Sequence, residues 1–155
     1  MRITKRSNIA IRVLMFCGAN AGRLVTKSEV AQVCNTSENH LAQVINRLGQ
    51  LDYLKTQRGR GGGIMLARPM SEICIGAIFR ELESHVPIAE CFADVDNSCP
   101  LVEACRLKQA VAAAAEAFYA HLDEVSLDAL VCDNKALHEI LVPASCSGAS
   151  LMAEA

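Results

Sequence analysis

The stretch from residue 37 to residue 66 constrains the fold more than any other part of this chain. Apolar residues recur after Ser37 at spacings of three and four, at Leu41, Val44, Ile45, Leu48 and Leu51. This is the period of an amphipathic helix, so the pattern predicts a helix with one buried and one exposed face. Two short apolar segments, residues 53–56 and 64–66, follow with a glycine-rich, arginine-bearing loop between them, which predicts a β-hairpin.

Two shorter helices are predicted before this segment. Residues 9–17 form a mostly apolar first helix, bounded by Gly18 and Gly22. Residues 29–34 form a second helix, which Thr26 or Ser28 can cap, and residues 35–37 make the turn into the third helix. Three helices and a hairpin in this order predict a mainly α fold, a winged helix-turn-helix in residues 1–70 with a small β-hairpin as its wing.

Charge divides the chain at the same boundary. Residues 1–70 carry eleven Lys and Arg against three Asp and Glu, a net charge of +8, whereas residues 71–155 carry four against fourteen, a net charge of -10. Such asymmetry indicates that the first half faces a polyanion. Only 4% of the residues are aromatic, which disfavours a protein that stacks single-stranded bases. We therefore expect double-stranded DNA as the partner.

Nine residues are predicted to contact that DNA. They lie near the N-terminus, on the polar face of the third helix and in the glycine-rich loop: Arg2, Lys5, Ser37, Asn39, His40, Gln43, Arg47, Arg58 and Arg60. Amide side chains suit base edges and arginines suit phosphates or a narrow minor groove. A phosphate-cradling loop is the weaker interpretation of the glycines, because no Gly-Lys-Ser/Thr follows and a strand comes next.

The second half, residues 71–142, is predicted to be helical around one irregular stretch. A helix over residues 72–83 begins after a Ser71 cap, residues 84–104 are rich in loops, and a long helix covers residues 106–124. Four consecutive alanines in the long helix allow a neighbouring helix to approach closely, so we expect a dimerisation helix. Ser126 caps a short turn over residues 127–131, a last helix covers residues 135–141, and residues 143–155 form a loose tail.

Three cysteines mark the irregular stretch as a candidate metal site. Cys91, Cys99 and Cys105 are spaced Cys-x7-Cys-x5-Cys, close enough to bind one metal centre. Pro100 favours the first turn of a helix, so Cys99 is predicted at a helix start, where a thiolate is stabilised. Thiolates are the ligands of zinc and of iron–sulfur clusters. Cys17, Cys34 and Cys74 lie on apolar helical faces and are expected in the core.

The chain shows no membrane-spanning or signal segment. No apolar run reaches the ~18 residues of a membrane span, and Arg12 interrupts the apolar stretch near the N-terminus. We therefore expect a cytoplasmic protein that does not bind membranes. A reducing compartment also favours metal or redox chemistry for the cysteines over disulfides. No catalytic arrangement of Ser, His and Asp or of paired carboxylates stands out, so an enzyme is not expected.

Three segments resemble the Rrf-two family of bacterial winged-helix regulators. They are MRITKRSNIAIRVLMFC, SENHLAQVINRLGQLDYLKTQRGRGGGIMLARP and ECFADVDNSCPLVEACRLKQA. The resemblance covers roughly residues 1–142, and RGRGGG together with Cys-x7-Cys-x5-Cys is specific. It is greatest toward the nitric-oxide-sensing repressors of the family.

The resemblance implies a homodimeric repressor with an iron–sulfur cluster, [4Fe–4S] in preference to [2Fe–2S], held by Cys91, Cys99 and Cys105. Repressors of this kind control genes for nitric oxide detoxification or denitrification until nitric oxide attacks the cluster. In them a partner-subunit Asp near the N-terminus supplies the fourth ligand, and Asn8 occupies that position here. Asn8, water, Glu90 or Asp94 are the options for the fourth ligand, and a helix cap is the structural alternative for Asn8.

Two other functions fit parts of the pattern. The rhizobial iron regulators of the same family resemble this chain in cysteine spacing and in Asn8, and they imply a response to iron or cluster status. Another branch of the family places a His three residues after the third cysteine, where this chain has Lys108, which argues against that branch. Outside the family, the cysteines suit a zinc or thiol redox sensor whose winged helix binds another protein.

Overall fold

The computed structural model describes residues 3–83, 87–93 and 97–142, so Arg2, Asp94 and the predicted tail, residues 143–155, lie outside the described residues. Its helices and strands are α1 (Lys5–Ala19), α2 (Lys27–Val33), α3 (Glu38–Gln50), β1 (Leu54–Gln57), β2 (Gly63–Leu66), η1 (Met70–Glu72), α4 (Ile75–Glu83), η2 (Glu90–Phe92), η3 (Val102–Ala104), α5 (Arg106–Asp123), α6 (Leu127–Val131) and α7 (Lys135–Leu141).

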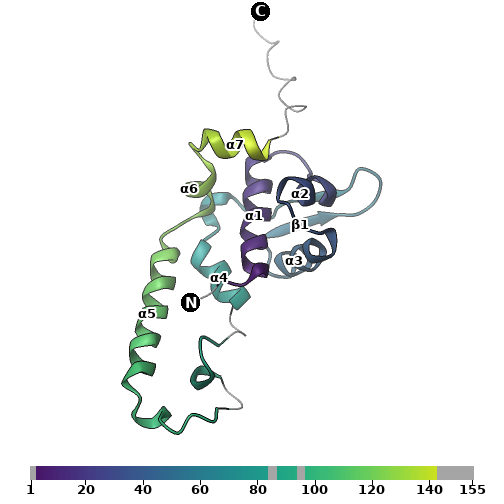
Figure 1. Ribbon diagram of the computed structural model, residues 1–155. Helices are drawn as coiled ribbons and strands as arrows, with labels where there is room; N and C mark the ends of the chain where they lie inside the picture. The colour runs from purple at the N-terminus through teal and green to yellow at the C-terminus, as the bar shows by residue number, and fades with distance from the viewer. Residues whose placement is uncertain (1–2, 84–86, 94–96, 143–155) are drawn as a thin grey trace, which may run out of the picture.

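Helix α1 is the centre of the winged helix (Figure 1). It contacts α3, α4, α6 and β2, and it buries Val13, Leu14 and Phe16 completely. The helix begins at Thr4, whose side chain accepts a hydrogen bond from the Ser7 amide. The helix continues through Gly18, which was expected to end it. A Cβ added to Gly18 would meet the Met70 side chain. The small residue lets η1 pack against α1.

The helix-turn-helix forms as predicted. Thr26 caps α2 through a capping box, since its side chain accepts from the Glu29 amide while Glu29 accepts from the Thr26 amide. Ser37 caps α3. Asn35 adopts a positive φ of 47° in the turn between the two helices, a conformation that Asn tolerates.

The wing is the expected two-stranded antiparallel hairpin, with Leu54 opposite Leu66 and Gln57 opposite Gly63. Gly59 and Gly61 in its loop have φ values of 102° and 80°, which side chains with a Cβ rarely adopt. The hairpin is fixed to the body through two backbone hydrogen bonds between Val25 and Ile64, of 2.8 and 3.0 Å. The base of the wing is therefore held in place relative to α2.

The predicted helix over residues 72–83 is wrong in its first turn. The chain forms the short 3-10 helix η1 and then an extended step at Cys74 before α4. This step pairs with Ser126, because the Ile75 amide donates to the Val125 carbonyl and the Leu127 amide to the Ile73 carbonyl, each at 2.9 Å. Cys74 is accordingly part-exposed and not in the core, unlike the buried Cys17 and Cys34.

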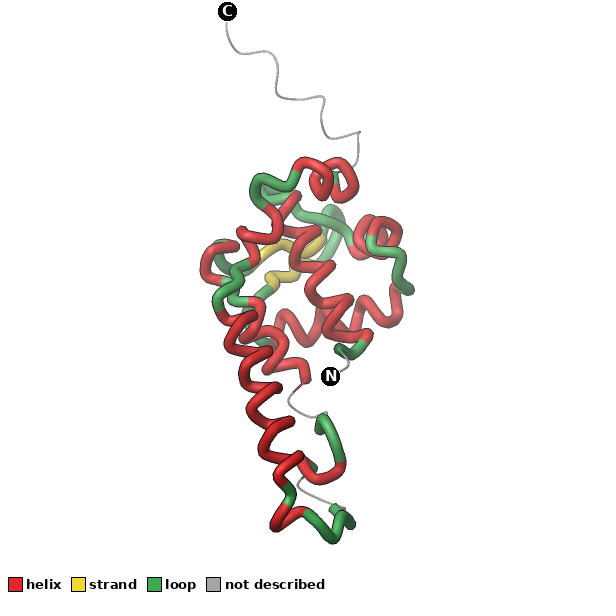
Figure 2. Tube along the Cα trace, turned by 60° about the vertical axis from the view of Figure 1, so that its left-hand side comes forward, coloured by secondary structure: helices red, strands yellow, loops and turns green. Residues whose placement is uncertain are grey.

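The long helix α5 stands out from the winged helix. Its C-terminal end lies beside α4, and its N-terminal end projects with the cysteine loop at the far end (Figures 1 and 2). Helices α6 and α7 lie where the sequence predicts them, and Leu127, Val131 and Leu141 return to the core. Within the described residues, none of the helices combines the length and hydropathy that crossing a membrane requires.

Candidate DNA-binding surface and cysteine loop

The exposed face of α3 is mostly polar, with Ala42 as its apolar position. Leu41, Val44 and Leu48 are buried, and helical spacing then turns four amide side chains outward: Asn39, Gln43, Asn46 and Gln50. Each carries a donor and an acceptor, the combination that pairs with the edge of adenine in the major groove. Asn39 and Gln43 are two of the nine contacts predicted from the sequence, and Asn46 and Gln50 lie on the same polar face.

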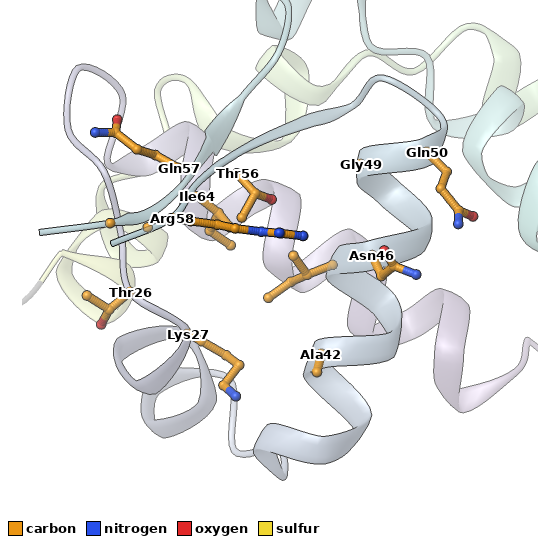
Figure 3. Close-up of a pocket in the computed structure, with 13 residues that line it drawn as sticks. Thr26, Lys27, Ala42, Asn46, Gly49, Gln50, Thr56, Gln57, Arg58 and Ile64 are labelled. Atoms are coloured by element: carbon orange, nitrogen blue, oxygen red, sulfur yellow. The ribbon is translucent and has the colours of Figure 1, made fainter. Parts of the chain in front are cut away.

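A groove of about 650 Å³ separates α3 from the wing. Lys27 from α2, Asn46 and Gln50 from α3, and Gln57 and Arg58 from the wing line it. Figure 3 shows that the Arg58 side chain extends across the groove toward α3. The sequence does not predict Lys27 as a DNA contact, because Lys27 lies on α2 and only the folded structure places α2 beside the wing.

Three of the predicted contacts have partners within the chain. Ser37 uses its hydroxyl to cap α3 and lies 3.0 Å from Nδ1 of His40, so these neighbours act as a pair. Arg47 lies on the edge of α3 toward α4, where its guanidinium is 3.9 Å from the Glu81 carboxylate. Arg47 is thus turned away from the centre of the amide face.

A second, smaller cavity of about 330 Å³ joins the N-terminus of α1 to α3. Lys5, Arg6, His40 and Gln43 line it. It continues the basic surface on the side of α3 opposite the wing. Arg58 and Arg60 are exposed at the wing tip, so cationic side chains flank the amide face on both sides.

The cysteine loop joins α4 to α5. Cys91, Cys99 and Cys105 are all partly buried, and each lies on a different short segment: η2, the stretch before η3, and the start of α5. The predicted helix start at Cys99 is wrong, because a turn and the 3-10 helix η3 follow it. Cys105 has that place instead, since it caps α5 and its sulfur accepts from the Lys108 amide at 3.4 Å.

The two ends of this loop are linked by a contact between their neighbours. The Nζ of Lys108 lies 5.9 Å from the centroid of the Phe92 ring, which brings η2, and with it Cys91, toward the first turn of α5. In the described ranges, no three His, Cys, Asp or Glu side chains are arranged to hold a metal ion. Residues 91–105 therefore supply three thiols that are not gathered around one point.

Asn8 lies on the second turn of α1 and is exposed. The interpretation of Asn8 as the cap of the first helix is wrong, because Thr4 has that role.

Two buried thiols outside the loop, those of Cys17 and Cys34, have different surroundings from the loop cysteines. Burial raises the pKa of Cys17 to about 12 and also raises the pKa of Cys34, so both stay protonated at neutral pH and are poor metal ligands.

A family model described as "Rrf2: Iron-dependent Transcriptional regulator" matches residues 3–133. The chain belongs to the Rrf2 family. This confirms both the resemblance and the winged-helix fold expected from the sequence. Members of the family regulate transcription, so this protein is a transcriptional regulator.

Relatives with assigned names lie within the same family. The chain is 41% identical over 142 residues to the HTH-type transcriptional regulator NsrR of Geobacillus kaustophilus, covering 91% of this chain and 97% of that protein. It is 38% identical to Protein aau3 of Rhizobium meliloti, covering 84% and 85% of the two chains. Among Rrf2 regulators it is thus NsrR-like.

Solved structures share the fold at lower identity. T. potens IscR superposes with a TM-score of 0.65 at 22% identity, covering 88% of this chain and 90% of that one. CymR (YrzC), the global cysteine regulator of B. subtilis, superposes with a TM-score of 0.62, also at 22% identity, covering 84% and 96%. These structures support the arrangement of the winged helix and the long helix.

Proposed function

We propose that this Rrf2 protein is a homodimeric repressor whose affinity for its operator is controlled by an iron–sulfur cluster that reacts with nitric oxide. The observation that carries the proposal is the placement of the cysteine loop. It joins α4, which packs on the winged helix, to α5, the projecting helix. A group bound by the loop therefore acts between the DNA-binding unit and the helix through which we expect two copies to associate.

The groove between α3 and the wing accounts for DNA binding. The amides of α3 enter the major groove, and Arg58 and Arg60 follow the backbone or an adjacent minor groove. Lys27 adds a cation at the base of the wing, although it also pairs with Glu38 at 3.1 Å. The net charge of +8 on residues 1–70 supplies the salt-dependent part of the affinity.

The chemistry of the cysteine loop suits a cluster with three protein thiolates. Cys105 sits at the N-terminus of an 18-residue helix and accepts an amide hydrogen bond at its sulfur, which complements a negatively charged ligand. Cys91, Cys99 and Cys105 would hold the cluster, with [4Fe–4S] in preference to [2Fe–2S]. When bound, the cluster supplies iron that nitric oxide attacks. Asn8, exposed on α1, is the candidate fourth ligand to the cluster of a partner subunit.

The decisive experiment titrates anaerobic holo-protein with nitric oxide while operator binding and visible absorbance are followed together. We expect both to fall at the same ratio of nitric oxide to protein. Cys99→Ala should lack the absorbance, whereas Cys17→Ala, which alters a buried thiol far along the chain from the loop, should retain it. A Cys99→Ala protein with a normal spectrum would contradict the ligand assignment.

The same samples separate the two alternative functions. A protein whose cluster is present but whose DNA affinity is unchanged by nitric oxide, and is lost when iron is withdrawn, would be a RirA-like regulator. RirA is the rhizobial iron regulator of this family, and the signal would then be iron status. A colourless protein with stoichiometric zinc is a thiol sensor. Either result would replace nitric oxide sensing as the function.

A further inference from the structure

One arginine connects the winged helix to the long helix. The guanidinium of Arg80 on α4 donates to both carboxylate oxygens of Glu116, at 3.0 and 3.3 Å, and to Asp123 at 2.8 Å. Its Cζ also lies 4.7 Å from the centroid of the Tyr119 ring. Glu116, Tyr119 and Asp123 follow one another at helical spacings of three and four, so one face of α5 holds this arginine over two turns.

The two helices approach closely at this contact. A Cβ added to Gly76 on α4 would lie 2.6 Å from the backbone nitrogen of Asp123, a distance that only a shift of the backbone would relieve. Just beyond α5, the backbone hydrogen bonds that join Ile73 and Ile75 to the segment around Ser126 hold the chain to the body. The C-terminal end of α5 is therefore fixed, and Arg80 fixes its direction as it leaves the body.

The projecting part of α5 amplifies any change of that direction. An 18-residue helix is about 27 Å long, so a rotation of about 5° at the fixed end displaces the other end by about 2 Å. In a dimer joined along α5, this angle decides where the second subunit places its α3. Inserting one base pair moves a half-site by about 3.4 Å and turns it by about 34°. A small change in the angle between α4 and α5 therefore displaces the end of α5 by a distance of the same order as one base-pair step.

We propose that Arg80 is a positioning residue that sets the spacing between the two DNA half-sites that the dimer recognises. This inference rests on the proposed function, since it requires a dimer on DNA. Exposed ion pairs generally contribute little, but bidentate geometry and networks are the exception, and Arg80 has both. A lysine keeps the charge but lacks the planar fork that binds Glu116 at two points and stacks on Tyr119.

The test measures DNA affinity as a function of half-site spacing. The reference is a duplex that the wild-type holo-protein selects from a random pool, and its derivatives gain or lose one or two base pairs between the half-sites. The variants are Arg80→Lys and Glu116→Gln. The matched control is Glu124→Gln, which removes an exposed carboxylate from the end of α5 that forms no ion pair among the described residues.

We expect wild type and Glu124→Gln to lose about tenfold or more in affinity when the spacing changes by one base pair. Arg80→Lys and Glu116→Gln should lose less than about threefold, while their affinity for the reference duplex stays within about threefold of wild type. Thermal melting of each protein accompanies the assay, and Glu116→Gln keeps the test usable if Arg80→Lys unfolds.

Two results would overturn the inference while leaving the dimeric repressor intact. The first is an equally sharp spacing preference in both variants. The second is an equal loss of affinity at every spacing, which would give Arg80 a purely structural role. A wild-type protein that binds without any spacing preference would contradict the proposed dimer on DNA itself, and the inference with it.

Discussion

Asn8 is the residue at which the sequence left two roles open, and the structure removes one of them. Thr4 caps α1 through the Ser7 amide, and Asn8 lies one turn later with its side chain exposed. The N-cap is the residue that directly precedes the first residue with helical backbone angles. No local pattern in the sequence shows whether that residue is Thr4 or Asn8. Because Asn8 is exposed, its amide is accessible for the proposed role as a ligand to a partner subunit's cluster.

We predict that Asn8→Asp slows the reaction of the cluster with nitric oxide and with oxygen, because a carboxylate is a stronger iron ligand than an amide. Asn8→Ala should leave the melting temperature unchanged, since Asn8 caps nothing. Stopped-flow decay of the cluster absorbance measures the first effect. Thr4→Ala is the control for capping and should cost about 1 kcal/mol of stability. Equal decay rates in wild type and both Asn8 variants would remove Asn8 from the mechanism.

Arg58 is the wing residue whose side chain crosses the groove beside α3 (Figure 3). We predict that Arg58→Ala weakens DNA binding and lowers the slope of log K against log salt by about 0.9, the value for one lost phosphate contact. Fluorescence anisotropy over a range of salt concentrations measures both. Lys135→Ala, which removes an exposed cation from α7, should leave affinity and slope unchanged. An unaltered slope in Arg58→Ala would mean that Arg58 is merely solvated.

Helix α2 contains a carboxylate whose ionisation contributes to stability. The pKa of Glu29 is lowered, chiefly by the hydrogen bond from the Thr26 amide, and Arg23 pairs with the same carboxylate at 2.9 Å. A lowered pKa in the folded state means that this stabilisation is present above the unfolded value of about 4.5 and is lost as the pH falls below it. The helix that supports the wing is therefore sensitive to acid.

We predict that Glu29→Gln lowers stability at pH 7 and that its difference from wild type shrinks as the pH falls from about 5 to about 3. Chemical denaturation at several pH values measures this. The variant keeps an acceptor for the Thr26 amide but loses the charge that Arg23 needs. A constant Glu29→Gln deficit across the whole range would contradict the assignment.

Elements defined by local signals were predicted well from the sequence. The cap at Ser37, the turn at Asn35, the wing and the short helices α6 and α7 all depend on residues near one another in the chain. The break before α4 was missed because it depends on pairing between Cys74 and Ser126, about fifty residues apart. The helix start was placed at Cys99 because Pro100 follows it, whereas that proline begins only a turn that leads into η3.

The candidate site was predicted less completely than the fold. Residues of α3 and of the wing could be identified because each set lies on one continuous segment. Lys27 was missed because it reaches the groove from a third element, and the turn of Arg47 toward α4 was missed because its partner, Glu81, is more than thirty residues away. The three loop cysteines are recognised by spacing alone, and no pattern in the chain shows how they are oriented.

At the scale of the whole molecule, the described residues leave a long face of α5 uncovered. No residue of α5 is buried. Among its partly buried positions, Phe118 packs against Phe79 of α4 and Lys108 lies over Phe92. A neighbouring stripe of exposed residues, mostly small or apolar, runs along the helix: Leu107, Ala110, Ala114, Ala117 and, at its end, the polar His121. Leu107 is 70% exposed. Spacings of three and four with small side chains suit close packing against another helix, as the proposed dimer requires.

We predict that Ala114→Glu converts the proposed dimer into a monomer, because association would bury an unpaired carboxylate at a cost of several kcal/mol. Every 1.4 kcal/mol weakens association about tenfold. Light scattering after size-exclusion chromatography gives the mass. Ala120→Glu adds the same charge to α5, about a third of a turn away from the stripe, and should remain dimeric. Operator affinity should fall with Ala114→Glu alone, because a single winged helix contacts one half-site and loses the benefit of being linked to a second. A dimeric Ala114→Glu protein with full affinity would place the subunit interface on another surface.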